Sequence, residues 1–147
     1  MKTLLHLFGW TLAGFALLQL IHIDIPTPPT PKAGDTVTAP APVMAAFKKG
    51  CYDCHSNRDN IPWYGNIAPI SFEVRQHVKD GRAWLNFDLF NRYDATKKQK
   101  IYKGIVKTVS YGSMPIPMYL WKHKEARLTP NERKAIIDWA KRHITEE

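Results

Sequence analysis

Cys51-Tyr52-Asp53-Cys54-His55 contains both cysteines of this 147-residue chain. The C-x-x-C-H pattern is typical of c-type haem attachment. Each thiol can form a thioether with a haem vinyl group, and the imidazole after the second thiol can bind the iron as its proximal ligand. The motif therefore predicts one covalently attached haem c, tethered by Cys51 and Cys54 and ligated by His55, around which the domain folds.

Three other uses of the two cysteines remain as alternatives. A thioredoxin-like dithiol belongs in a βαβ context, and no strand–helix–strand pattern surrounds this motif. A structural zinc site needs two further ligands at matching spacing, and no second Cys or His pair supplies them. A short-loop disulfide would leave His55 without a role. Haem attachment accounts for all three residues and is preferred.

The chain has 21 Lys and Arg against 13 Asp and Glu, which gives a net charge of +8. This balance favours an acidic protein partner, an anionic membrane surface or nucleic acid, and it also keeps a domain soluble. The redox partners of a haem protein with this charge are expected to be acidic or membrane-bound. Nucleic acid is not expected as a partner, because the basic residues are spread along the chain without a known nucleic-acid-binding motif. The length suits one domain plus a targeting segment.

From Leu4 to Ile25 the chain is apolar apart from a few polar residues, with Lys2 in front. A bilayer span needs about 20 mostly apolar residues. No convincing small-residue cleavage site follows, which favours a retained anchor over a cleaved signal peptide, although cleavage stays open. Residues 1–25 are therefore predicted to form a transmembrane helix, which would make this a single-pass protein of the bacterial inner membrane with its haem domain in the periplasm.

Residues 26–42 contain six prolines, separated mainly by Thr and Ala. Proline removes a backbone donor and restricts φ, so a semi-rigid extended linker is predicted here. Residues 43–147 form the predicted haem c domain.

Apolar spacing within that domain predicts helices and no strand pair, which indicates an all-α fold. A Thr129-Pro130-Asn131-Glu132 capping box, with proline at the first helical position, marks the start of the last helix. The predicted helices cover 43–54, Ile70 to Gly81, Asp94 to Gly112, and a last segment that begins after Thr129.

Met114 is the predicted sixth ligand of the haem iron, and Met118 is the runner-up. Met114 follows Gly112 in a proline-rich loop, which can cross the far face of a haem rigidly. A thioether ligand raises the haem potential relative to two imidazoles. Met44 lies in an apparent helix and is expected to fill the core instead.

His77 lies on the apolar face of the second predicted helix, where it can be a buried core residue, a propionate partner or a sixth ligand. His123 is expected to have ordinary partners. The aromatic side chains are numerous, and some of them are expected to wall the haem: Trp63, Tyr64, Trp84, Phe87, Tyr111 and Tyr119.

The chain resembles the haem-binding domain family of small, membrane-anchored, monohaem c-type cytochromes of bacteria. The resemblance extends over almost everything after residue 42, and it implies a cytochrome-c-like helical fold without identifying a partner or a reaction. Two departures, Phe72 and Lys124, replace the family's usual Trp and Pro and touch no proposed ligand. The matching stretches are Cys51 to Asn57, Pro62-Trp63-Tyr64, Ile67 to Ser71, Gly81-Arg82, Leu85-Asn86-Phe87, Gly112-Ser113-Met114-Pro115 and the run from His123 to Trp139.

The function expected from these features is single-electron transfer by a monohaem c-type cytochrome, and a carrier is preferred to an enzyme. The rival functions are a haem peroxidase-like enzyme and a haem-based sensor or accessory subunit of a membrane complex. A peroxidase needs an open sixth position and a distal acid–base group, for which His77 or His123 are the candidates.

Overall fold

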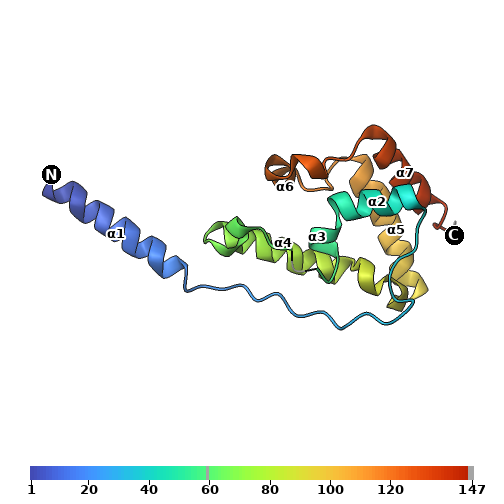
Figure 1. Ribbon diagram of the computed structural model, residues 1–147, viewed down its shortest axis with the longest axis horizontal. Helices are drawn as coiled ribbons and strands as arrows, with labels where there is room; N and C mark the ends of the chain where they lie inside the picture. Colours follow the sequence, from blue (N-terminus) through green and yellow to red (C-terminus); the bar gives the residue numbers. More distant parts are fainter. Residues whose placement is uncertain (59, 146–147) are drawn as a thin grey trace.

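The computed structural model describes residues 1–58 and 60–145, and the regular elements within them are all helices (Figure 1). The predicted all-α fold of this part of the chain is confirmed. In chain order the elements are α1 (Lys2–Leu18), α2 (Ala41–Gly50), α3 (Tyr52–His55), the 3-10 helix η1 (Trp63–Asn66), α4 (Ile70–Trp84), η2 (Phe87–Arg92), α5 (Ala95–Ser110), α6 (Pro117–Lys122), η3 (Lys124–Ala126) and α7 (Pro130–Lys141).

Two helix starts follow the predicted capping residues. The Asp94 side chain accepts a hydrogen bond from the Lys97 N–H at 2.7 Å and begins α5. At the start of α7, Thr129 Oγ1 accepts from the Glu132 N–H, and a Glu132 carboxylate oxygen accepts from the Thr129 N–H. These bonds satisfy backbone donors that a helix leaves unpaired at its first turn.

Other boundaries differ from the prediction. The helix expected over 43–54 is two helices, α2 and α3, because Cys51 leaves helical geometry with φ −127°. Gly81 does not end α4, which continues to Trp84. The short elements η2 and α6 were not predicted.

The core lies where α2 and η2 meet the α5–α7 pair, and aromatic rings dominate it. Phe47 of α2 has its ring centroid 4.6 Å from that of Phe87 and 5.3 Å from that of Trp139 on α7. Tyr52, which lies inside the cysteine motif, stacks on Phe87 at 5.2 Å. The motif is therefore anchored directly to the core.

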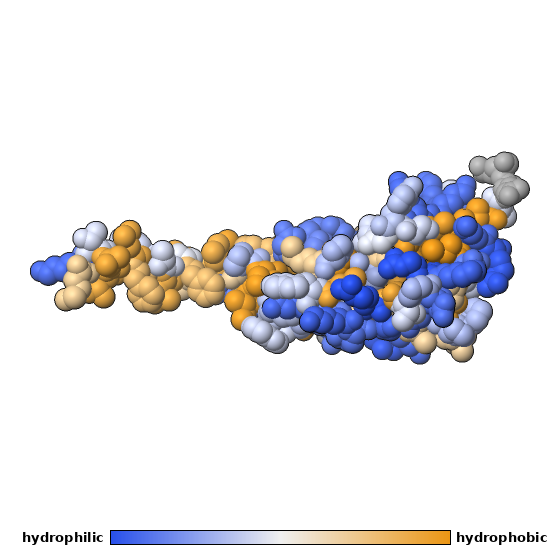
Figure 2. Space-filling view, turned by 90° about the horizontal axis from the view of Figure 1, so that it is seen from above, coloured by the Kyte–Doolittle hydropathy of each residue, from blue (hydrophilic) through white to orange (hydrophobic). Residues whose placement is uncertain are grey.

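The prediction of a transmembrane helix, and with it a single-pass inner-membrane location, is wrong. Helix α1 has 17 residues, and none of them is buried. At 1.5 Å per residue it is about 26 Å long, which is less than the roughly 30 Å thickness of the hydrocarbon core of a bilayer. Among the described residues, no helix has both the length and the apolar character needed to cross a membrane. The apolar run does not stay helical to Ile25, since Gln19 caps α1 and its side chain accepts from the Ala68 N–H at 2.9 Å. Figure 2 shows α1 as a largely apolar arm beside the more polar domain.

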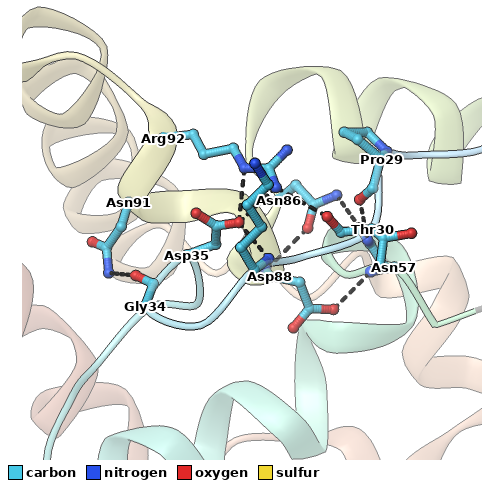
Figure 3. Close-up of polar contacts among 10 residues, drawn as sticks. Pro29, Thr30, Gly34, Asp35, Asn57, Asn86, Asp88, Asn91 and Arg92 are labelled. Carbon is cyan, nitrogen blue, oxygen red and sulfur yellow. Dashed lines mark hydrogen bonds and ion pairs between the residues drawn. The ribbon is translucent and has the colours of Figure 1, made fainter.

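Residues 26–40 of the proline-rich segment form no helix or strand, while Ala41 and Pro42 belong to α2, and part of the segment lies against the domain (Figures 1 and 3). We call residues 29–37 the strap. Val37 is buried, and its N–H donates to the Phe87 carbonyl at 2.8 Å. Arg92 donates through Nε and Nη2 to Asp35 Oδ2 at 2.8 and 2.6 Å, and through Nη2 to the Thr30 carbonyl at 2.9 Å. These contacts attach the strap to η2.

The strap also reaches the residues that follow the cysteine motif. Asn57 Nδ2 donates to the Pro29 carbonyl at 3.0 Å, while its N–H donates to Asp88 Oδ2 at 2.9 Å. Asn86 Nδ2 donates to Asn57 Oδ1 at 2.7 Å, and Asn86 is buried. One polar network therefore joins the strap, η2 and the end of the motif (Figure 3).

Replacing Arg92 with alanine should release the strap from η2. The Arg92 hydrogen bond is the main cause that lowers the pKa of Asp35, so this contact is fully present at neutral pH and is lost as the pH falls through that lowered pKa. We expect amide hydrogen exchange at Val37 to accelerate about tenfold in Arg92→Ala at neutral pH, because charge-assisted hydrogen bonds are lost. Arg75→Ala is the control, since Arg75 donates to Asn66 Oδ1 and, among the described residues, has no hydrogen bond to the strap or to η2, so Val37 should stay protected. Unchanged exchange at Val37 in Arg92→Ala would show that the strap is held elsewhere.

Candidate functional site

The cysteine motif opens on a cavity of about 250 Å³ between α3, α4 and the segment that connects α5 to α6. Cys51 lies between α2 and α3, and Cys54 lies within α3. The structure brings three of the predicted site residues, Cys51, Cys54 and His55, together with Met114 at this one cavity. The wall is completed by Gly50, Asp53, His77, Asp80, Gly81, Trp84, Pro115, Ile116 and Tyr119.

Both thiols are free and are held in the neutral form. Burial raises the pKa of Cys51 to about 12 and the pKa of Cys54 to about 11, with smaller contributions from neighbouring negative charge. A reactive dithiol has at least one thiol with a lowered pKa. The electrostatics of this site therefore do not favour a thioredoxin-like use of the pair.

His55 is held by the main chain of α4. Its Nδ1 lies 3.0 Å from both the Gly81 and the Leu85 carbonyl oxygens, so Nδ1 carries the proton and donates it. Burial lowers the pKa of His55, and these two carbonyls only partly oppose that effect. The ring is thus a neutral imidazole whose Nε2 has a free lone pair, which is the form that binds a metal ion.

Helix α4 approaches the motif closely because Gly81 has no side chain. A Cβ atom at Gly81 would lie 2.7 Å from the Cys54 carbonyl oxygen and 3.4 Å from Cys54 Cβ. Backbone atoms cannot turn aside as a flexible side chain can. Glycine at this position sets the distance between α4 and α3, and with it the position of the carbonyls that hold His55.

Gly81→Ala should therefore destabilise the protein, although alanine ordinarily favours a helix over glycine by about 1 kcal/mol. Overpacking typically costs about 1–3 kcal/mol, so after the helix-propensity gain we expect a net loss of up to about 2 kcal/mol in the free energy of unfolding measured with urea. Gly14→Ala in α1 is the matched control, because a Cβ there meets nothing within 4 Å. A Gly81→Ala protein as stable as the wild type would mean that α4 can shift without cost.

Met114 is positioned by the end of α5. Gly112 has φ +69°, a left-handed conformation that favours glycine after a helix. The N–H groups of Ser113 and Met114 then both donate to the Thr108 carbonyl, at 3.0 and 3.3 Å. Met118 lies instead on α6 with 67% of its surface exposed. It does not line the 250 Å³ cavity, although it lines the neighbouring cavity described below.

A second cavity of about 350 Å³ adjoins the first, and the two share the walls formed by Asp53, Cys54, His77, Ile116 and Tyr119. His77 is half-exposed and lies 3.8 Å from a Glu73 carboxylate oxygen, so it is not a fully buried core residue. The predicted wall aromatics divide between the cavities: Trp84 lines the first, Trp63 and Tyr64 line the second, and Tyr119 lines both. Phe87 lies in the core, and Tyr111 is exposed.

Two polar contacts at these cavities were not predicted from the sequence. Tyr119 Oη donates to Asp53 Oδ2 at 2.6 Å, which together with burial raises the pKa of Tyr119. Tyr64 Oη lies 2.7 Å from His123 Nε2, and His123 Nδ1 donates to Glu125 at 3.0 Å. The partners are far apart in the chain, so no local pattern signals either contact. They join α6 and the segment after it to the motif and to η1.

The donor set and the space both fit a haem. The cavities together fall within the roughly 300–1,000 Å³ range of ligand sites. The first cavity is lined by two neutral thiols, a neutral imidazole and a thioether sulfur. Thiols are the groups that attach haem c, and imidazole and thioether are groups that bind haem iron. The fold and the site define a small helical haem-binding protein.

A family comparison gives the same class. Residues 13–142 match the model of the haem-binding domain family, and the chain belongs to that family. No curated protein and no solved structure gives a significant match.

Proposed function

We propose that this chain holds one haem c in a cytochrome-c-like arrangement, with thioethers to Cys51 and Cys54 and with His55 and Met114 as axial ligands. The observation that carries the proposal is the convergence of these four side chains on one cavity. Met114 is preferred over Met118 because only Met114 lines that cavity. The bound haem would supply a redox-active iron.

The protein residues would make this site a carrier of single electrons. His55 is kept neutral and in one tautomer by two backbone carbonyls, which orients its free nitrogen lone pair. Met114 is tied through its N–H to α5, which limits its freedom to leave the cavity. If His55 and Met114 both bound the iron, no position on it would remain open to a substrate, and the thioether would favour the ferrous state.

The test is a redox titration of the purified protein combined with exposure of its ferrous form to carbon monoxide. We expect one reversible one-electron wave and an absorption spectrum that the gas does not change. Rapid carbon monoxide binding together with turnover of hydrogen peroxide would instead identify a peroxidase-like enzyme. Gas binding without turnover would identify a sensor.

A further inference from the structure

Three lysines form a stripe along the exposed face of α5. Lys100, Lys103 and Lys107 are all exposed and follow the i, i+3, i+7 spacing that places residues on one side of a helix. The buried residues Ile101 and Ile105 of α5 face the core instead. The stripe is about 10 Å long at 1.5 Å per residue. We call these three residues the lysine stripe.

The three lysines of the stripe have no acidic partner among the described residues, whereas some other cationic side chains of the domain do. Lys49 pairs with Glu132, Arg92 pairs with Asp35, and Lys134 pairs with Asp138. No such ion pair involves Lys100, Lys103 or Lys107 within residues 1–58 and 60–145. Its positive charge is available to an external partner.

The helix that carries the lysine stripe touches the wall of the 250 Å³ cavity. Gly104 of α5 lies next to the indole of Trp84, since a Cβ at Gly104 would be 3.3 Å from Trp84 Cζ2. Trp84 also lines the cavity, and the Lys97 ammonium lies 4.7 Å from the Trp84 ring centroid. The C-terminal end of α5 leads directly to Met114. The stripe thus lies beside the cavity, one aromatic ring away.

We propose that the lysine stripe and Trp84 form the docking surface for an acidic one-electron redox protein. This inference rests on the proposed electron-carrier function. Electron transfer falls steeply with distance, so a partner must dock close to the haem cavity. The lysine stripe is an unpaired positive surface on the helix that contacts the cavity wall at Trp84. Its short length suits the small, transient interfaces of redox encounters, which bury less than about 1,200 Å².

The first test measures reduction of the ferric protein by a reduced plant-type [2Fe–2S] ferredoxin, an acidic donor with a potential of about −400 mV. One electron passes from the donor cluster to the haem iron, and no bond is made. The variant Lys100→Gln/Lys103→Gln/Lys107→Gln should lower the bimolecular rate about tenfold at low ionic strength, with the difference shrinking as salt is added.

The matched control removes the same charge from another face. Lys134→Gln/Lys141→Gln/Arg142→Gln, on and just after α7, should change the rate less than twofold. Hexaammineruthenium(II), a cationic donor, should not reduce the stripe variant more slowly than the wild type. Equal rate losses in the two triple variants would overturn the proposal, because net charge alone would then explain them.

A second readout does not depend on electron transfer. Hexacyanochromate(III), a paramagnetic and redox-inert anion, should broaden the amide signals of Lys100, Lys103 and Lys107 and the indole N–H signal of Trp84 in an NMR titration. Broadening centred elsewhere would overturn the docking surface. Failure of hexaammineruthenium(II) to reduce the wild type would reject the carrier function itself, and the two failures are thus distinguishable. If the stripe variant kept its ferredoxin rate but lost binding to single-stranded DNA or to anionic vesicles, the surface would belong to that other partner.

Discussion

Replacing both cysteines in Cys51→Ala/Cys54→Ala should leave the protein with no covalently attached haem. The thiols of Cys51 and Cys54 are the only groups that could form thioethers with a haem, because the chain has no other cysteine. We therefore expect denaturing mass spectrometry to give the mass of the polypeptide alone, where the wild type carries the added mass of one haem. The loss should be complete.

The single variants Cys51→Ala and Cys54→Ala are the matched controls for this experiment. Each keeps one thiol at the cavity and should still carry haem through one thioether, at reduced yield. A double variant that retained haem after denaturation would refute covalent attachment through the motif. A wild type that lost its haem on denaturation would show a non-covalent site.

Met114→Ala should open one face of the iron and lower the haem potential. Axial-ligand identity shifts haem potentials over a range of about 0.8 V, and loss of a thioether ligand should lower this one by roughly 100 mV or more. The near-infrared sulfur–iron charge-transfer band should disappear, and the ferrous protein should bind carbon monoxide. Absorption spectroscopy and a redox titration measure all three effects.

Met118→Ala provides the control, because this side chain is exposed on α6 and does not line the cavity of His55. It should leave the band, the potential and the gas reactivity unchanged. If the two variants exchanged their effects, Met118 would be the ligand. If neither altered the spectrum, His77, which lines the same cavity, would become the leading candidate.

Features encoded by neighbouring residues were predictable from the sequence. The haem motif, the Asp94 cap and the Thr129 capping box each depend on residues within a few positions of one another. The capping hydrogen bonds form largely irrespective of the rest of the fold. The family match to residues 13–142 agrees with the haem expected from the motif.

Features that depend on distant residues were not predictable. The prolines indicated that residues 26–40 form no helix, but the contact of this segment with Arg92 depends on η2, which was not predicted from the sequence. The helix α1 ends at Leu18, although the apolar residues continue, and the Gln19 side chain beyond it bonds to Ala68. Composition alone does not reveal that break. The contact between Tyr119 and Asp53 joins residues 66 positions apart.

The two hydrogen bonds that orient His55 have a consequence for how the sequence of this protein can evolve. Its two hydrogen-bond partners are peptide carbonyls at Gly81 and Leu85, and every amino acid carries a peptide carbonyl. No single substitution can delete either acceptor, in contrast to the carboxylate side chains that orient many metal-binding histidines. Substitutions in α4 can therefore weaken the hydrogen bonds that orient His55 only by displacing the end of this helix. Selection should act here on the backbone conformation more than on the identity of the side chains.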